Sequence, residues 1–280
     1  MKKIYFIILT LSIAACISAQ EKIKLTILHT NDTHSQVEPL EKNASRHPDM
    51  GGYARRMGVI EKIRHEEENV LLFDAGDFLQ GTPYFNLYRG YVETDAMNKM
   101  KYDAGTIGNH EFDNGLDSLA NIIKSCRFPI VNVNYDFSNT PIGDSVNPYI
   151  VLEKAGLKIG VFGLGVDPKG LVMENNYKGM TYNDPVTAAN QTARYLKEEE
   201  ECDLIVCLSH LGSDKNSKNI NDYALASQSE FIDIIIGGHS HQHISDLHVK
   251  NAKNREIIIA QMGKSGIFLG RIDLEFEKRK

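Results

Sequence analysis

The chain contains no tryptophan, few cysteines and no excess of positive charge. Among its 280 residues there are no Trp, 4 Cys and 8 Pro, and the formal net charge at pH 7 is -6. So few cysteines do not support a disulfide framework. The negative balance gives no global attraction for nucleic acid, so no nucleic-acid partner is expected. An anionic substrate would need a local source of positive charge.

Long apolar runs are also scarce. One stands at residues 4–15 behind two lysines, and it is too short and wrongly flanked to span a membrane. Residues 1–19 are therefore predicted to be an export signal. Two cleavage sites stay open: before Cys16, where "IAAC" resembles a lipobox and the thiol would carry lipid, or after Ala19. The protein is expected in the periplasm or cell envelope, with a membrane as partner only through a lipid on Cys16.

The other cysteines, Cys126, Cys202 and Cys207, form no CxxC pair. Five positions apart on one strand, Cys202 and Cys207 would point to opposite faces. We interpret all three as small buried apolar side chains rather than bridging or metal-binding thiols.

The composition, 42% hydrophobic and 24% charged, is ordinary for a soluble globular protein. Short apolar runs rich in β-formers alternate with helical stretches, which indicates an α/β fold with sheets between helix layers. "NPYIVLEKAGLKIGVFG" is predicted to be a hairpin that turns at Ala155–Gly156. Strands are predicted at 24–30, 69–76, 128–134, 157–165, 203–210, 231–238, 255–262 and 266–277, and helices at 53–68, 89–101, 116–126 and 184–201.

Polar groups follow the carboxyl ends of five apolar runs, where loops of an open α/β sheet converge on a site. "GNHEFD", at 108–113, crowds an amide, an imidazole and two carboxylates into one loop. The converging set is predicted to be a metal site made of Asp32, His34, Asp77, Asn109, His210, His239 and His241.

This donor set suits borderline divalent metals such as zinc, manganese or iron. Seven donors are too many for one ion and about right for two, if one carboxylate bridges. Two dications bring four positive charges, and two carboxylates with a hydroxide remove three. The centre would therefore stay positive inside an acidic protein, as a phosphate requires.

The motifs "DTH", "GDFLQGTP", "GNHEFD", "SHLG" and "GGHSH" resemble, in order and spacing, those of the calcineurin-like metallophosphoesterases. From about Ile23 onward the chain is similar to the catalytic domain of the 5'-nucleotidases, with "ILHTNDTHSQVEP" and "GDFLQGTPYF" as close matches. The resemblance implies a four-layer α/β-β/α sandwich of two mixed sheets flanked by helices.

The resemblance also implies roles. One metal would take Asp32, His34 and His241, and the other Asn109, His210 and His239, with Asp77 bridging. His110 would stabilise the phosphoryl group or protonate the leaving oxygen, and Asp113 would orient it. Glu111 is expected to be solvated or to fix the loop.

The implied function is release of phosphate from nucleotides by attack of a metal-bridging hydroxide. Residues 20–280 would be the catalytic domain. The C-terminal domain that grips the nucleoside in the 5'-nucleotidases is expected to be absent, so that the leaving group is recognised either by a separate polypeptide or only loosely. The alternatives are a phosphodiesterase or nucleotide-sugar hydrolase of the same fold, and a non-catalytic metal-binding lipoprotein.

Some histidines are set apart from this centre. In an extended "HSHQH", His243 lies on the same face as His239 and His241 and could compete as a ligand. His29 is expected to be structural, and His47, His65 and His248 to be solvated. "GGYARR", at 51–56, is expected to start a packing helix, with Arg55 near the site as an open alternative.

Overall fold

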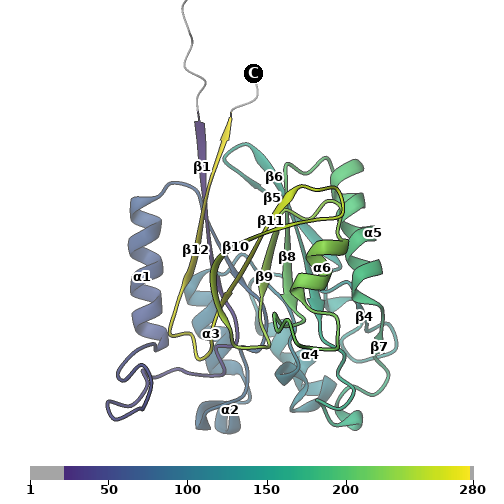
Figure 1. Cartoon of the computed structure of the whole chain (residues 1–280). Coiled ribbons are helices and arrows are strands. Elements are labelled where there is room, and N and C mark those ends of the chain that lie inside the picture. Colours follow the sequence, from purple (N-terminus) through teal and green to yellow (C-terminus); the bar gives the residue numbers. More distant parts are fainter. Residues whose placement is uncertain (1–21, 278–280) are drawn as a thin grey trace, which may run out of the picture.

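The computed structural model describes residues 22–277, so the predicted export signal and Cys16 lie outside the described residues. Two β-sheets face each other and helices cover both outer sides, which gives the four layers that the resemblance implies (Figure 1). No helix within residues 22–277 is long and apolar enough to cross a membrane.

The first sheet has the order β12-β1-β2-β3, with β1 parallel to β2 and antiparallel to β12. Its strands are β1 (Lys22–Thr30), β2 (Val70–Asp74), β3 (Ala104–Gly105) and β12 (Gly270–Glu277). Parallel and antiparallel pairs thus occur in one sheet, as expected.

The second sheet has the order β10-β11-β9-β8-β6-β5, in which the four inner strands are parallel and both edges are antiparallel. Its strands are β5 (Tyr149–Lys154), β6 (Leu157–Gly165), β8 (Leu204–His210), β9 (Ile234–Gly237), β10 (His243–Lys250) and β11 (Glu256–Met262). A small separate sheet pairs β4 (Tyr135–Asp136) with β7 (Thr181–Tyr182).

The helices are short and lie outside the sheets. They are α1 (Tyr53–Glu66), α2 (Pro83–Tyr88), α3 (Tyr91–Met100), α4 (Gly115–Ser125), α5 (Pro185–Glu198) and α6 (Asp222–Gln228). Single 3₁₀ turns occur at His110–Phe112, Gly143–Ser145 and Glu174–Asn176. Asp184 caps α5 by accepting from the Thr187 N–H, directly before Pro185.

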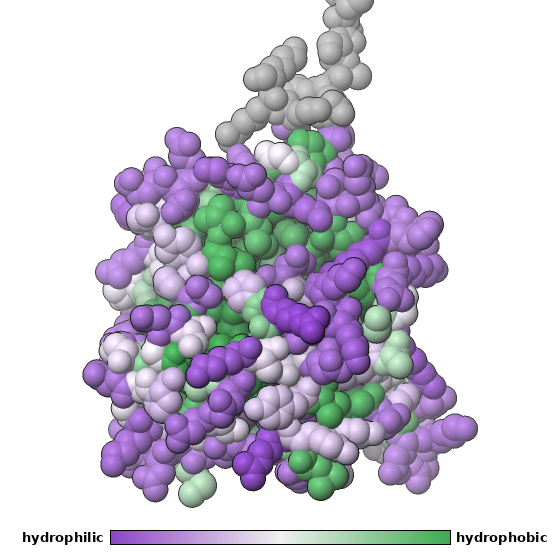
Figure 2. Space-filling view, turned by 180° about the vertical axis from the view of Figure 1, so that it is seen from behind, coloured by the Kyte–Doolittle hydropathy of each residue, from purple (hydrophilic) through white to green (hydrophobic). Residues whose placement is uncertain are grey.

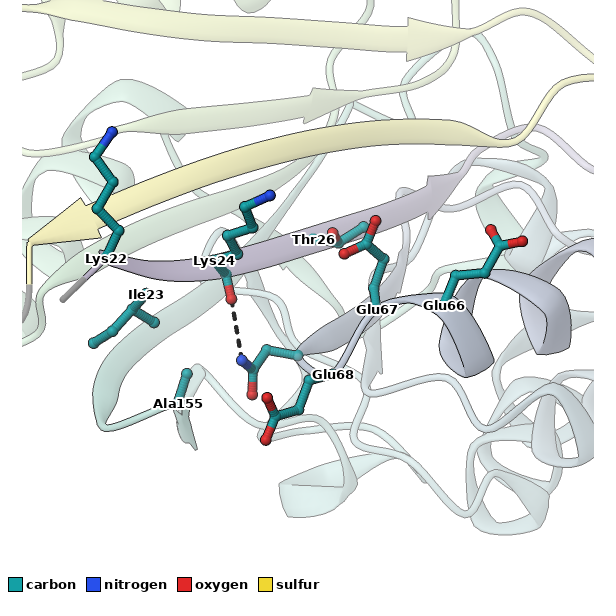
Figure 3. Close-up of a pocket in the computed structure, with 9 residues that line it drawn as sticks. Lys22, Ile23, Lys24, Thr26, Glu66, Glu67, Glu68 and Ala155 are labelled. Carbon is teal, nitrogen blue, oxygen red and sulfur yellow. Dashed lines mark hydrogen bonds between the residues drawn. The ribbon is translucent and has the colours of Figure 1, made fainter.

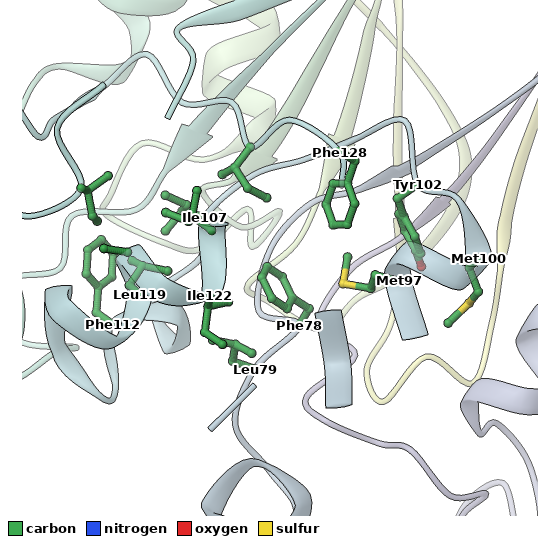
Figure 4. Close-up of a cluster of buried hydrophobic side chains, with 14 of the residues drawn as sticks. Phe78, Leu79, Met97, Met100, Tyr102, Ile107, Phe112, Leu119, Ile122 and Phe128 are labelled. Atoms are coloured by element: carbon green, nitrogen blue, oxygen red, sulfur yellow. The ribbon is translucent and has the colours of Figure 1, made fainter. Parts of the chain in front are cut away.

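Strand alternation divides the buried side chains among three clusters. Ile27 of β1 and Val206 of β8 lie between the sheets, because their side chains point to the facing layer. Leu28, one residue later, points to the opposite side and joins the cluster that contains residues of α1, α3 and α4. Figure 4 shows part of this cluster, including Met97 and Leu119. Cys207 likewise points toward α5 and α6. Burial of apolar area on both faces of each sheet stabilises the layers and fixes where the strands end.

The surface outside these clusters is mostly hydrophilic. Figure 2 shows this for the face turned away in Figure 1, where the widest hydrophobic area lies in the upper half and smaller ones lie below it.

Several predicted elements are confirmed and one is wrong. The hairpin turns at Ala155–Gly156, as predicted. Residues 128–134 form only single bridges, at Ile130 and Val131, because Pro129 has no N–H to donate to a ladder. The helix predicted at 89–101 is confirmed as α3, whereas α2 was not predicted and is separated from α3 by the left-handed backbone of Arg89 and Gly90.

The three described cysteines are free, as expected. The argument that Cys202 and Cys207 lie on one strand and point to opposite faces was wrong. Cys202 precedes β8 instead of lying on it, and it shares a hydrophobic cluster with Cys207.

Candidate metal centre

The seven predicted donors meet at one edge of the two sheets. Asp32 and His34 follow β1, Asp77 follows β2 and Asn109 follows β3, so the first sheet supplies four of them. His210 ends β8, and His239 and His241 lie in the turn between β9 and β10 of the second sheet. The centre therefore spans the junction of both sheets.

One group of donors contains Asp32, His34 and His241. His241 Nε2 lies 3.2 Å from Asp32 Oδ1, and His34 Nε2 lies 3.1 Å from His241 Nε2. The donor atoms of all three lie within 4.8 Å of one another. Three ligand atoms at such spacing can share one ion.

A second group contains Asp77, His210 and His239. His210 Nε2 lies 3.0 Å from Asp77 Oδ2, and Asn109 Oδ1 lies 2.8 Å from His239 Nδ1. Asp77 Oδ2 is also 4.0 Å from His34 Nε2 of the first group. The Asp77 carboxylate thus lies between the groups.

The surroundings of His210 fix which of its ring nitrogens faces Asp77. Its Nδ1 lies 2.7 Å from the Ala75 carbonyl and must donate to it, because a carbonyl only accepts. Its buried Nε2 has no well-oriented hydrogen bond and faces the Asp77 carboxylate. Two electron-pair donors that face each other require a cation between them. Burial disfavours a proton there, but the charge of Asp77 outweighs burial and raises the pKa of His210 to about 10.

A divalent cation fits the same position. Burial lowers the pKa of His34 and that of His239 to about 4, so both rings are neutral at pH 7, the form that binds metal. Burial opposes ionisation of Asp77, but His210 and His34 hold its pKa well below the ordinary value. The neutral rings of His34 and His239 and the ionised carboxylate of Asp77 are in the states that bind metal, whereas His210 would have to release its Nε2 proton to a metal ion.

The backbone at these donors is unusual. Left-handed φ angles occur at five of them: Asp32 (49°), His34 (45°), Asp77 (56°), His239 (70°) and His241 (54°). Such angles cost non-glycine residues on the order of 1–3 kcal/mol each and persist only where the surroundings hold them. The fold therefore gives up stability to aim these side chains.

Gly108 leaves the space in which the donors meet. A Cβ at this position would overlap Asp77 Oδ1 and would lie 2.7 Å from His210 Nε2. Any other side chain would enter the gap between these donors.

His110 and Asp113 form a pair at the rim. His110 Nδ1 lies 2.8 Å from Asp113 Oδ2, and both side chains are about one third exposed. This hydrogen bond raises the pKa of His110 above its ordinary value, despite partial burial. The His110 ring lies against the His34 ring, with 5.2 Å between their centroids. The backbone N–H of His110 donates to Asp77 Oδ1 at 2.9 Å.

Glu111 fixes the loop and is not solvated. The residue is 2% exposed, and its carboxylate accepts from the N–H groups of Asp77 (2.9 Å), Gly108 (2.6 Å) and Leu79 (3.1 Å). One of the two expectations for this residue is therefore correct and the other is wrong. The carboxylate ties the loop after β2 to the loop after β3.

The remaining candidates lie apart from the centre. His243 is exposed and its ring lies 4.6 Å from that of Phe268. His29 is buried within β1, as expected of a structural residue, and burial lowers its pKa to about 4. Arg55 is paired with Asp49 on the surface. Exposed positions are found, as expected, for His47, His65 and His248.

A cavity of about 540 Å³ lies at the other end of the first sheet (Figure 3). Lys22, Lys24 and the run Glu66–Glu68 line it, and Lys22 is paired with Glu275 at 2.8 Å. The cavity borders the first residues of β1, whereas the donors follow the last, so it belongs to a different region.

Two buried carboxamides beside the donors were assigned no role from the sequence. Asn31, 1% exposed, donates to Asp32 Oδ2 (2.6 Å) and to the Gly263 carbonyl (2.9 Å). Gln261 is fully buried against the turn that carries His239 and His241. The position of Asn31 directly before Asp32 could have singled it out, but nothing in "IIIAQMG" distinguishes Gln261.

Comparisons with known proteins identify the family of this chain. The family model for the calcineurin-like phosphoesterases matches residues 25–243. The chain is 33% identical to the trifunctional nucleotide phosphoesterase protein YfkN of Bacillus subtilis, covering 91% of this chain and 18% of that protein. It is 31% identical to human 5'-nucleotidase, covering 91% of this chain and 47% of that protein.

Solved structures of related proteins have the same fold. The 5'-nucleotidase precursor from Thermus thermophilus superposes with a TM-score of 0.82 at 32% identity, covering 91% of this chain and 52% of that one. For calcineurin-like phosphoesterase YfkN from Bacillus subtilis the TM-score is 0.77 at 30% identity, covering 92% and 87%. The chain thus spans about half the length of the 5'-nucleotidases that it matches. It belongs to the calcineurin-like phosphoesterase family, as a metallophosphoesterase related to the 5'-nucleotidases.

Proposed function

We propose that this chain releases phosphate from nucleotides at a centre of two divalent cations, of the zinc or manganese kind. The observation that carries the proposal is the buried His210 Nε2, which faces Asp77 Oδ2 at 3.0 Å with no hydrogen bond of good geometry between them. A cation belongs between these atoms, and the donors around them suffice for a second one. Similarity to 5'-nucleotidases supports nucleotides as substrates.

The proposed distribution of ligands follows the two groups. Asp32, His34 and His241 hold one cation, whereas Asn109, His210 and His239 hold the other. Asp77 binds both. Asn109 contributes an oxygen without charge, so the two carboxylates leave the loaded centre positive, as an anionic phosphate requires.

The loaded cations would activate a water molecule for attack on phosphorus and would stabilise charge on the phosphoryl oxygens. His110 then acts on the departing side. The hydrogen bond that His110 Nδ1 donates to Asp113 favours the protonated form of His110, and the partial exposure of His110 lets substrate reach the ring. A protonated imidazole can stabilise the phosphoryl charge or donate a proton to the leaving oxygen.

The test is phosphate release from a panel with the purified full chain. The panel contains AMP, GMP, CMP, a cyclic nucleotide, a sugar nucleotide and an aryl phosphate, each with Mn²⁺, with Zn²⁺ and after chelation. We expect hydrolysis of the monophosphates that chelation abolishes and metal restores. Hydrolysis of only the cyclic or sugar nucleotide would favour the phosphodiesterase alternative. Metal binding without any hydrolysis would favour the binding lipoprotein.

Export and a substrate-binding partner are further parts of the proposal. Residues 1–19 act as the export signal, with cleavage before Cys16 or after Ala19, and residues 20–280 act as the catalytic domain. Mass spectrometry of the mature N-terminus, with Cys16→Ser as the variant, separates the two cleavage sites. A nucleoside-gripping domain from another polypeptide should raise kcat/KM for AMP more than for an aryl phosphate.

A further inference from the structure

The buried carboxamide of Gln261 lies behind the turn that carries two candidate ligands. We propose that Gln261 is a positioning residue for the imidazoles of the second sheet and that it thereby sets the affinity for metal. This inference rests on the proposed metal centre. Gln261 is the second-last residue of β11, and its side chain is completely buried.

The carboxamide binds the turn on both sides of each imidazole. Its Nε2 donates to the Gly238 carbonyl at 2.8 Å, directly before His239. Its Oε1 accepts from Ser240 Oγ at 3.1 Å, between the two histidines, and from the Gln242 N–H at 2.6 Å, directly after His241. The three residues that flank the two ligands therefore all contact one side chain.

The turn needs such support because its backbone is strained. It lies between the end of β9 and the start of β10, and His239 and His241 both have left-handed φ angles. Left-handed angles at non-glycine residues persist only where contacts hold them. Gln261 provides these contacts from a strand that is itself fixed between β9 and β10.

A second set of hydrogen bonds extends the support to His210. Gln261 Nε2 also donates to Ser213 Oγ at 3.0 Å, and this hydroxyl donates to Asp222 Oδ2 at 2.6 Å. Asp222 Oδ1 accepts from Ser209 Oγ at 2.5 Å, one residue before His210. The Ser213 N–H donates to Ser240 Oγ at 2.9 Å, which closes the network onto the turn.

Only a carboxamide can make these bonds together. Two donors and an oxygen that accepts twice are used at once, so a carboxylate would lose both donors and an apolar side chain would lose everything. Supporting partners that orient metal ligands typically change metal affinity by about 10–100-fold when removed.

The experiment measures binding of Mn²⁺ and Zn²⁺ alone to the chelator-stripped full chain, by competition with a chromogenic chelator. Gln261→Met keeps the length of the side chain and removes the carboxamide. Asn251→Leu is the matched control, because Asn251 is also a buried carboxamide with three hydrogen bonds, to Glu230, Lys253 and Arg255, in the turn at the far end of β11. Apo melting temperatures are recorded for each variant.

We expect Gln261→Met to weaken binding by about 10–100-fold. Asn251→Leu should leave the Kd for metal unchanged, although it should lower the melting temperature of the metal-free protein about as much as Gln261→Met does. Ser240→Ala removes one bond to the carboxamide and should weaken metal binding by less. If Gln261→Met fails to fold, Ser240→Ala is the deciding variant. A Kd within threefold of wild type in the deciding variant would overturn the inference alone. A wild-type chain that binds neither cation would overturn the proposed function as well.

Discussion

Glu111→Ala should destabilise the metal-free protein strongly, although Glu111 belongs to neither group of metal donors. The carboxylate accepts three buried backbone N–H groups, from Asp77, Leu79 and Gly108. A buried donor left without a partner costs about 1–3 kcal/mol, so three of them could cost several kcal/mol. Water that enters the vacated space lowers this loss, and we expect about 3 kcal/mol. Domains have only about 5–15 kcal/mol to lose.

Glu111→Gln should destabilise the protein less than Glu111→Ala. The amide oxygen can replace Oε2, which accepts from Asp77 and Gly108, but the NH₂ group then faces the Leu79 N–H. One bond is lost instead of three, so about 1–3 kcal/mol is expected.

Urea denaturation of the chelator-treated variants is the assay, because bound metal would add its own stabilisation. A loss below about 1 kcal/mol for Glu111→Ala would show that these three bonds do not hold the loops together. Burial raises the pKa of Glu111 from 4.5 to about 8 in the folded protein. A raised folded pKa means that stability declines as pH rises between these values. The wild type should therefore lose stability relative to Glu111→Gln over that range, and parallel pH profiles would contradict this.

Four further substitutions test the centre directly. Asp77→Asn should lower the metal content measured after purification and nearly abolish turnover, whereas two bound ions with near-normal activity would refute the bridging role. His110→Ala should keep the metals and reduce kcat by about 10²–10⁴-fold, the usual contribution of a positioned proton donor. Asp113→Asn should lose less, and because its hydrogen bond raises the pKa of His110, the alkaline limb of its pH–rate profile should move to lower pH. Gly108→Ala places a methyl against Asp77 Oδ1 and should reduce metal affinity without unfolding the chain; unchanged affinity would show that the loop moves aside.

The position of the centre could be predicted from the sequence because its donors follow buried strands. Asp32, Asp77 and His210 stand at or just past the ends of β1, β2 and β8, whose apolar patterns are clear. Parallel strands bring such ends to one edge whatever the details of the helices. Strand pattern and strand-end chemistry together thus placed all seven donors in one region, while their roles as ligands stay a prediction.

Other features depend on tertiary contacts that no local pattern records. β10 was not predicted, since it alternates between half-buried and exposed residues and is stabilised by pairing with β11. Residues 128–134 have a strand-like composition, yet Pro129 and the absence of a full partner ladder leave them irregular. Glu111 and Gln261 are polar residues whose burial depends on distant loops. Their roles become visible only when those loops are in place.

The pairing of β1 with β12 has a consequence for attachment. Lys22 lies opposite Glu277, so the chain enters and leaves the described fold side by side, while the metal donors follow the other end of β1 (Figure 1). The nine residues of β1 span about 30 Å. A lipid tether before Lys22 would therefore attach the protein at the end of β1 that lies opposite the candidate metal donors. The edge that carries these donors would then face away from the membrane. Any polypeptide joined after Glu277 would have to travel the same 30 Å or so along the outside of the sandwich before it could touch a substrate on the metals.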